Sequence, residues 1–278
     1  MTNDLEALAR AAVAGDGAAL SALCRALEAP VFRLCLRLLG DVRDAEDAAQ
    51  DVLVKVVTNL SAFEGRSALT TWVHRIAVRH VLAAKASRAE VRALDEDGFA
   101  ALLEQGLAFA ATQPPPSAED RVLINEVRLG CTQGMVMMLS REERLAVVLV
   151  ELLGFDAKEA AEVLEVSHEA LRQRLSRARA RLGGFLQERC GVVNEGAACR
   201  CDAQLAGKRA LGLSLETQRF APLSRGDVEA RVDVGVAQQE LAHVRAIASA
   251  FHRDGLFTAP GSLRARLEAL LPTVLGGR

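Results

Sequence analysis

The sequence predicts an all-α protein in which two helical domains, joined by an acidic linker, precede a small and mainly helical C-terminal extension. Three observations support this prediction. Half of the 278 residues are hydrophobic but only 4% are aromatic, and Ala, Leu, Val and Arg dominate, so the core is built from aliphatic side chains in a helix-forming composition. Apolar residues recur at helical spacing over most of the chain. No segment shows the alternation that is typical of a strand.

Breaks in the helical pattern divide the chain into four segments. The second segment carries six acidic and no basic residues and contains three consecutive prolines, which cannot continue a helix. The fourth opens with Gly and Cys, and we expect it to be irregular to about Gly226 and helical from there through His252. The predicted segments are a first helical domain (1–92), the acidic linker (93–120), a second helical domain (121–189) and the C-terminal extension (190–278).

Several classes of protein are excluded by composition and pattern. The chain has no run of about 18 uncharged apolar residues and no basic N-terminus followed by an apolar stretch. We therefore expect no membrane span, no signal peptide and a cytoplasmic location. The six cysteines are then expected to be reduced unless they bind metal or sense oxidants. We find no nucleophile–base constellation and no phosphate-binding loop, so we expect no enzymatic activity.

The segment from Asp44 to Leu60 predicts a helix with one buried face and one acidic face. Its apolar residues, from Ala45 onward, follow the i, i+3, i+4, i+7 pattern of a buried stripe. The other face is polar, and its carboxylates lie near the N-terminus, where the helix dipole favours them. Taken alone, such a face is most simply a solvated surface.

The next helix contains the only tryptophan, and residues 70–89 contain no acidic side chain. A cationic helix with an aromatic side chain suits phosphates and unstacked bases together. The alternative places Trp72 in the core and leaves the arginines on an ordinary surface.

The order of these elements resembles domain 2 of bacterial RNA polymerase sigma factors of the extracytoplasmic-function (ECF) type. Residues 44–51 read Asp-Ala-Glu-Asp-Ala-Ala-Gln-Asp, and a Phe-x-Gly-x-Ser loop and a Thr-Trp-x-x-Arg-Ile-Ala helix follow. The resemblance implies docking on the clamp helices of the largest polymerase subunit by Asp44, Glu46, Asp47, Gln50, Asp51 and Lys55. It also implies recognition and melting of the −10 promoter element by Phe63, Arg66, Ser67, Trp72, Arg75, Arg79 and His80. Residues 78–80, Val-Arg-His, stand where the family most often has Asn, so the base preference at −10 does not transfer.

The third segment independently predicts a helix-turn-helix. Ser140 and Glu143 form a capping box before a helix expected to run to Leu153. A helix over 157–164, a three-residue turn and a long helix from His168 to about Arg189 follow. The long helix holds five arginines within residues 172–181. Arginine and glutamine side chains read guanine and adenine edges, and the flanking arginines suit phosphates.

Residues 167–181 also resemble sigma domain 4, which implies binding of the −35 promoter element while the domain sits on the polymerase flap. The residues assigned to this contact are His168, Arg172, Gln173, Arg174, Ser176 and Arg177. The implied partners are core RNA polymerase and promoter DNA, and whether a separate anti-sigma factor exists stays open.

The C-terminal extension places three cysteines, Cys190, Cys199 and Cys201, within twelve residues. The segment resembles a Cys-Gly-Leu-Val…Cys-x-Cys extension that a subset of these sigma factors carries, which supports a regulatory module. Three interpretations stay open. The cysteines bind a structural zinc ion with His243 or His252 as the fourth ligand; they form a thiol–disulfide sensor in which Arg200 favours thiolate; or they are small buried residues of a docked tail.

We therefore predict a sigma factor that binds core RNA polymerase and directs promoter recognition and transcription initiation. The alternative is a helix-turn-helix transcriptional regulator with a ligand- or redox-sensing tail. That alternative has no use for the acidic face of residues 44–51.

Overall fold

The computed structural model describes residues 2–114, 117 and 120–210, and it confirms the all-α prediction for this part of the chain. The only β feature among these residues is an isolated bridge between Cys190 and Cys199. No helix within the described ranges is long and apolar enough to cross a membrane. The helices are α1 (Thr2–Val13), α2 (Gly17–Leu39), α3 (Val42–Thr58), η1 (Leu60–Ala62), α4 (Leu69–Ala83), α5 (Arg88–Arg92), α6 (Glu96–Ala110), α7 (Arg121–Met137), α8 (Arg141–Val147), η3 (Val148–Leu152), α9 (Ala157–Leu164), α10 (His168–Arg189) and α11 (Cys201–Ala210).

The described residues divide into two compact units. Unit 1 contains residues 2–91 and 156–168, and unit 2 contains residues 92–155 and 169–210. The predicted second helical domain has residues in both units, and the predicted domain boundaries stay predictions. The helix expected to end at His252 lies outside the described residues.

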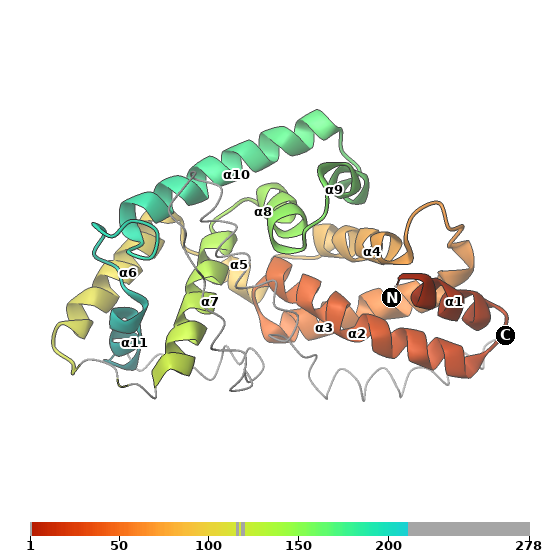
Figure 1. Ribbon diagram of the computed structural model, residues 1–278, viewed down its shortest axis with the longest axis horizontal. Helices are drawn as coiled ribbons and strands as arrows, with labels where there is room; N and C mark the ends of the chain where they lie inside the picture. Colours follow the sequence, from red (N-terminus) through yellow and green to blue (C-terminus); the bar gives the residue numbers. More distant parts are fainter. Residues whose placement is uncertain (1, 115–116, 118–119, 211–278) are drawn as a thin grey trace. The chain divides into compact units, whose positions relative to one another are not determined.

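Unit 1 is built around α2, α3 and α4, which pack on one another (Figure 1). Asp16 caps α2 and Asp41 caps α3, each by accepting hydrogen bonds from two backbone N–H groups. Gly40 ends α2 in the left-handed conformation, at a φ of 71°. The core between the helices is aliphatic, with Leu23, Leu27, Val31, Leu34, Leu38, Val52, Leu53, Val56, Val73 and Ala77 buried.

Unit 2 contains α6, a helix formed within the predicted acidic linker. The side chain of Asp95 caps α6 by accepting a hydrogen bond from the N–H of Gly98. α6 packs along α11, which also contacts α7 (Figure 1). The expectation of irregular chain up to Gly226 is therefore wrong for Cys201–Ala210. Local pattern missed this helix because its order comes from tertiary burial: Leu205 and Ala206 are buried within unit 2.

The second half of the chain otherwise follows the predicted elements closely. Ser140 and Glu143 form the expected capping box, and α9 spans the expected residues. The helix expected to reach Leu153 instead ends its α-helical part at Val147 and continues as the π-helical turn η3, in which the N–H of Leu153 donates to the carbonyl of Val148.

The crossing of α6 and α11 is close enough to require glycine. A Cβ on Gly207 would lie 2.2 Å from the carbonyl oxygen of Gly106. Gly207→Ala should therefore lower the free energy of unfolding by about 1–3 kcal/mol, because the two backbones must move apart. The matched control is Gly183→Ala in α10, where a Cβ meets nothing within 4 Å; it should raise stability by about 0.5–1 kcal/mol, since alanine is the better helix former. Urea unfolding of both variants tests the difference, and a neutral Gly207→Ala would contradict the close crossing.

Candidate functional site

The outer face of α3 is acidic, as the sequence predicts, and its residues differ in what they contact. Asp47, Asp51 and Lys55 are exposed, whereas Glu46 and Gln50 are half-buried. Asp44 is also half-buried: it accepts a hydrogen bond from the backbone N–H of Arg88 at 2.6 Å and pairs with the guanidinium of the same residue. Asp44 therefore joins α3 to the start of α5, and the exposed carboxylates of the acidic face are Asp47 and Asp51.

A polar contact links α3 to α4. The Nζ of Lys55 lies 2.8 Å from the Nδ1 of His80, and the Nε2 of His80 lies 3.7 Å from the carboxylate of Asp51. Burial and the charge of Lys55 lower the pKa of His80, and Asp51 opposes them. Two residues assigned to polymerase docking thus contact one assigned to the −10 element, so substitutions of His80 also affect α3.

The loop before α4 lies against the start of that helix through two aromatic rings. The ring centroids of Phe63 and Trp72 are 5.6 Å apart at an interplanar angle of 52°. Both residues are half-buried, so Trp72 is neither a core residue nor fully exposed. Arg66 is exposed in the loop and pairs with Glu64 at 2.8 Å, and Ser67 is half-buried.

The cationic residues of α4 are presented unequally. Arg75 is half-buried, whereas Arg79 is exposed and pairs with Glu165. Glu165 follows α9 in the left-handed conformation, at a φ of 55°, which is unfavourable for a residue with a Cβ. The turn in the predicted helix-turn-helix is therefore formed without the usual glycine.

α10 presents a polar face along its first half. His168, Arg172, Gln173, Ser176 and Arg177 are exposed and Arg174 is half-buried, whereas Leu171, Leu175 and Ala178 are buried. The exposed arginines make long contacts: Arg172 lies 3.5 Å from Glu169, and Arg177 lies 3.4 Å from Glu143. Exposed pairs of this kind contribute about 0–1 kcal/mol, so they yield easily to a phosphate or a base.

Two flanking arginines have structural partners that the sequence did not indicate. Arg179 forms an ion pair with Glu151, whose side chain is only 3% exposed. Arg181 lies 3.4 Å from Glu96. Arg179 is one of the flanking arginines that are expected from the sequence to contact phosphates. Its ion pair with the buried Glu151 conflicts with that role. The available signal was Glu151 itself, a single acidic residue in an otherwise apolar run from Leu145 to Leu153.

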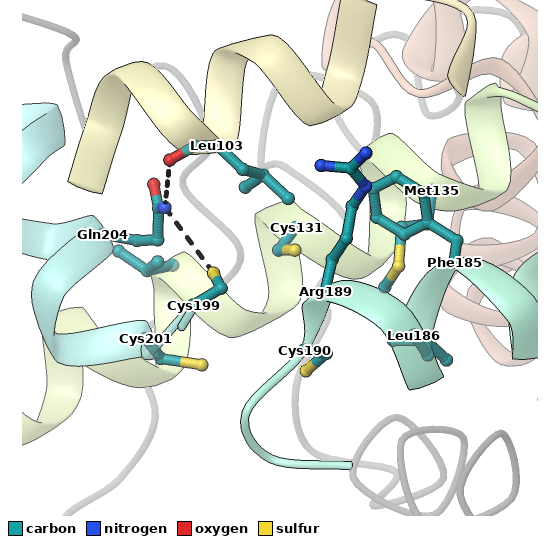
Figure 2. Close-up of a pocket in the computed structure, with 11 residues that line it drawn as sticks. Leu103, Cys131, Met135, Phe185, Leu186, Arg189, Cys190, Cys199, Cys201 and Gln204 are labelled. Atoms are coloured by element: carbon teal, nitrogen blue, oxygen red, sulfur yellow. Dashed lines mark hydrogen bonds between the residues drawn. The ribbon is translucent and has the colours of Figure 1, made fainter. Parts of the chain in front are cut away.

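Unit 2 also contains a cluster of four cysteines, which we call the thiol cluster: Cys131, Cys190, Cys199 and Cys201. All four line one cavity of about 30 Å³ (Figure 2). Cys131 comes from α7 and was not among the predicted ligands; His243 and His252 lie outside the described residues. Within the described ranges, no group of three or more His, Cys, Asp or Glu side chains is arranged so that it could hold a metal ion.

The pKa values of the cysteines in the thiol cluster contradict the interpretation in which Arg200 favours the thiolate form. Burial raises the pKa of Cys199 to about 11 and that of Cys131 to about 12, and burial also raises the pKa of Cys201. Arg200 does lower the pKa of Cys199, but less than burial raises it. Its guanidinium instead binds backbone carbonyls, including that of Glu195 at 2.8 Å. The thiols of Cys131, Cys199 and Cys201 are therefore protonated and slow to react with oxidants.

Several known proteins are similar to this chain in sequence. The family models "Sigma-70 region 2" and "Sigma-70, region 4" match residues 23–90 and 129–182. The ECF RNA polymerase sigma factor SigM of Mycobacterium tuberculosis is 31% identical over 195 residues, which cover 70% of this chain and 88% of that protein. The RNA polymerase sigma-H factor of Pseudomonas aeruginosa is 28% identical over 179 residues, covering 62% and 89%. A solved structure of CnrH in complex with the cytosolic domain of CnrY is 21% identical, covers 66% of this chain and 97% of that one, and has a TM-score of 0.44.

An all-α chain with an acidic-faced helix, a basic aromatic helix and an arginine-rich helix after a tight turn has the elements of a promoter-recognition factor. The chain belongs to the ECF RNA polymerase sigma factors. It is thus a sigma factor that directs promoter recognition, as predicted, and the alternative of a conventional helix-turn-helix regulator is not favoured. These matches indicate no enzyme family.

His74 on α4 gives unit 1 a pH dependence. Burial lowers the pKa of His74 from 6.5 to about 4, because the charged imidazolium is disfavoured. The unfolded chain therefore binds the extra proton first, so stability is fully present above pH 6.5 and is lost as the pH falls from 6.5 towards about 4. Thermal unfolding followed by circular dichroism should show a falling Tm across this window and a smaller fall for His74→Gln. The control His168→Gln, at an exposed position, should keep the wild-type slope; equal slopes for all three proteins would contradict the assignment.

Proposed function

We propose that this sigma factor acts in the cytoplasm through three surfaces, and that none of them is an enzyme site. The outer face of α3 binds the clamp helices of core RNA polymerase. The loop 63–68 with α4 binds the −10 promoter element, and the exposed face of α10 binds the −35 element while that part of the chain sits on the polymerase flap.

The observation that carries this proposal is the division of α10 into one buried apolar face and one exposed face that presents arginine side chains. Leu171, Leu175 and Ala178 are buried in the same turns from which Arg172 and Arg177 project outward. An arginine presented on one helix face can donate two hydrogen bonds to a guanine edge in the major groove. Gln173, exposed beside them, has the geometry to pair with adenine.

The −10 surface is supported by the paired rings of Phe63 and Trp72. Two aromatic side chains at the end of a cationic helix offer a stacking platform for an unpaired base, and Arg66, exposed in the same loop, can bind a phosphate. A flipped base can stack only on a ring that remains accessible, and Trp72 is half-exposed.

The polymerase surface is supported by the contrast within α3. Asp44 is half-buried against Arg88, whereas Asp47 and Asp51 are exposed on a helix whose opposite face is buried, and Asp51 also lies 3.7 Å from His80. We also propose that residues 190–278 regulate the factor, because the first part of this extension, up to Ala210, packs onto α6 and α7. An anti-sigma factor would compete for the same α3 or α4 surfaces.

The α3 assignment is tested by reversing its exposed charges. Asp47→Lys with Asp51→Lys should abolish binding of core RNA polymerase at physiological salt, because two attractive contacts become repulsive, while Tm stays near the wild-type value. Fluorescence anisotropy of labelled protein against purified core polymerase measures the affinity. The matched control is Asp4→Lys with Glu6→Lys in α1, which changes the net charge equally and should bind normally. Binding retained by the α3 variant would sink the assignment.

The α10 assignment is tested with single arginine variants. Arg172→Ala and Arg177→Ala should each cost about 1–3 kcal/mol on the preferred −35 sequence and relax base preference, if each reads a base edge. A phosphate contact would weaken all sequences equally and lower the salt slope by about one. Holoenzyme binding to specific and scrambled promoters, at several salt concentrations, separates the two. Arg179→Ala serves as the control, since its loss should reduce stability rather than sequence preference.

A further inference from the structure

The thiol cluster joins two parts of the chain that are about sixty residues apart in sequence. Cys131 lies on α7, whereas Cys190 follows the end of α10, Cys199 lies just before α11 and Cys201 begins it. The four labelled sulfur atoms surround one space in Figure 2, and the residues all belong to unit 2. A convergence of all thiols but Cys24 and Cys35 on one small cavity is more than a docked tail needs, because any small apolar residue would fill such a site.

The size of the cavity fits one ion. About 30 Å³ is room for one or two water molecules, so a single metal ion would also fit, with its sulfur ligands supplied by the lining. The remaining lining is mainly apolar, including Leu103, Val127 and Phe185, and it holds no carboxylate, so the cavity offers little to a hard, oxygen-seeking cation. Four thiols and no other strong ligand favour a soft, tetrahedral metal.

Contacts around the cluster hold its ligands in place. Gln204 donates from Nε2 to the carbonyl of Leu103 at 2.7 Å and to the Sγ of Cys199 at 3.6 Å. The N–H of Gly191 donates to the carbonyl of Cys199 at 2.9 Å, which holds the residues after α10 beside the start of α11. Such second-layer hydrogen bonds are what orients the ligands of metal sites in proteins.

The charges around the cluster match a bound ion with four thiolates. A divalent cation and four thiolates carry a net charge of about −2, which a buried site must offset. Arg128 hydrogen-bonds Cys201, the ammonium of Lys208 interacts electrostatically with Cys131, and Arg189 lines the cavity. Arg189 also pairs with Glu104 at 2.7 Å and with Glu188 at 3.2 Å, so Arg128 and Lys208 are the cations that thiolates of the cluster would attract.

We propose that Cys131, Cys190, Cys199 and Cys201 together bind one soft divalent metal ion, with Zn²⁺ as the working probe, and that this ion fastens the C-terminal extension to α7 and α10. In this structure the four thiols are not arranged so that they could hold an ion. Binding therefore requires their side chains to move towards one another and to release their thiol protons to solvent. Cys131 takes the place of the histidine expected as the fourth ligand.

The test uses the full chain, purified under reducing conditions and reconstituted with Zn²⁺. We expect one zinc per chain by elemental analysis, and the ligand-to-metal charge-transfer bands of a tetrathiolate when Co²⁺ replaces zinc. Cys131→Ser and Cys199→Ser should each lose the stoichiometric ion and those bands. Cys24→Ala, a buried cysteine of unit 1, is the matched control and should keep both. Wild-type protein that stays metal-free, or a Cys131→Ser variant that binds like wild type, overturns the proposal.

A second measurement keeps the test valid if a serine variant does not fold. Alkylation of the wild-type chain, mapped by mass spectrometry, should spare all four cluster thiols when zinc is bound and modify them after chelation, whereas Cys24 and Cys35 should stay protected in both states. Hydrogen exchange over 190–210 should accelerate on chelation, as expected if the ion fastens the extension. Equal protection with and without chelator, or a disulfide in place of the metal, would overturn the site.

Discussion

The close approach of α6 and α11 determines the arrangement of unit 2. Because Gly207 lies against the backbone of Gly106, α11 reaches α6 without side chains between them. That approach brings Gln204 to the carbonyl of Leu103 and to the sulfur of Cys199, which in turn sets Cys199 and Cys201 opposite Cys131. A short helix at the end of the described chain thereby orders both the acidic linker and the thiol cluster. Small residues at the crossing, more than any polar bond, make this possible.

Unit 1 depends on a different constraint, the separation of two faces on α3. The stripe from Ala45 to Val56 is buried so completely that the helix cannot rotate, and its carboxylates must therefore face outward. The structure also shows that the face is not uniform. Asp44 belongs to the fold, through Arg88, while the carboxylates one and two turns later remain exposed. A structural joint and the proposed polymerase-binding surface thus follow one another along a single helix.

Local features of the fold were predictable because local physics determines them. The capping residues Asp41 and Ser140, and the ends of α9, follow from rules that involve three or four neighbouring residues. Cys131 was missed because it approaches the other thiols only through tertiary packing, from about sixty positions away in the chain. The pairing of Arg179 with Glu151, and the helix α11, were missed for the same reason. The faces that carry the proposed contacts were predicted as patterns, but which of their residues already have intramolecular partners could be learned only from the structure.

The placement of arginines on α10 has a consequence for how promoter preference can change over time. The arginine that secures the helix, Arg179, is bonded to a buried carboxylate, whereas Arg172 and Arg177 make only long contacts at the surface. In the proposed function, Arg179 therefore anchors the helix within the protein, whereas Arg172 and Arg177 contact the DNA bases. Under the proposed function, substitutions of Arg172 and Arg177 would alter the preferred DNA sequence at little cost in folding free energy. A gene duplicate of this factor could acquire a new set of target promoters through a few such changes, while retaining the same scaffold.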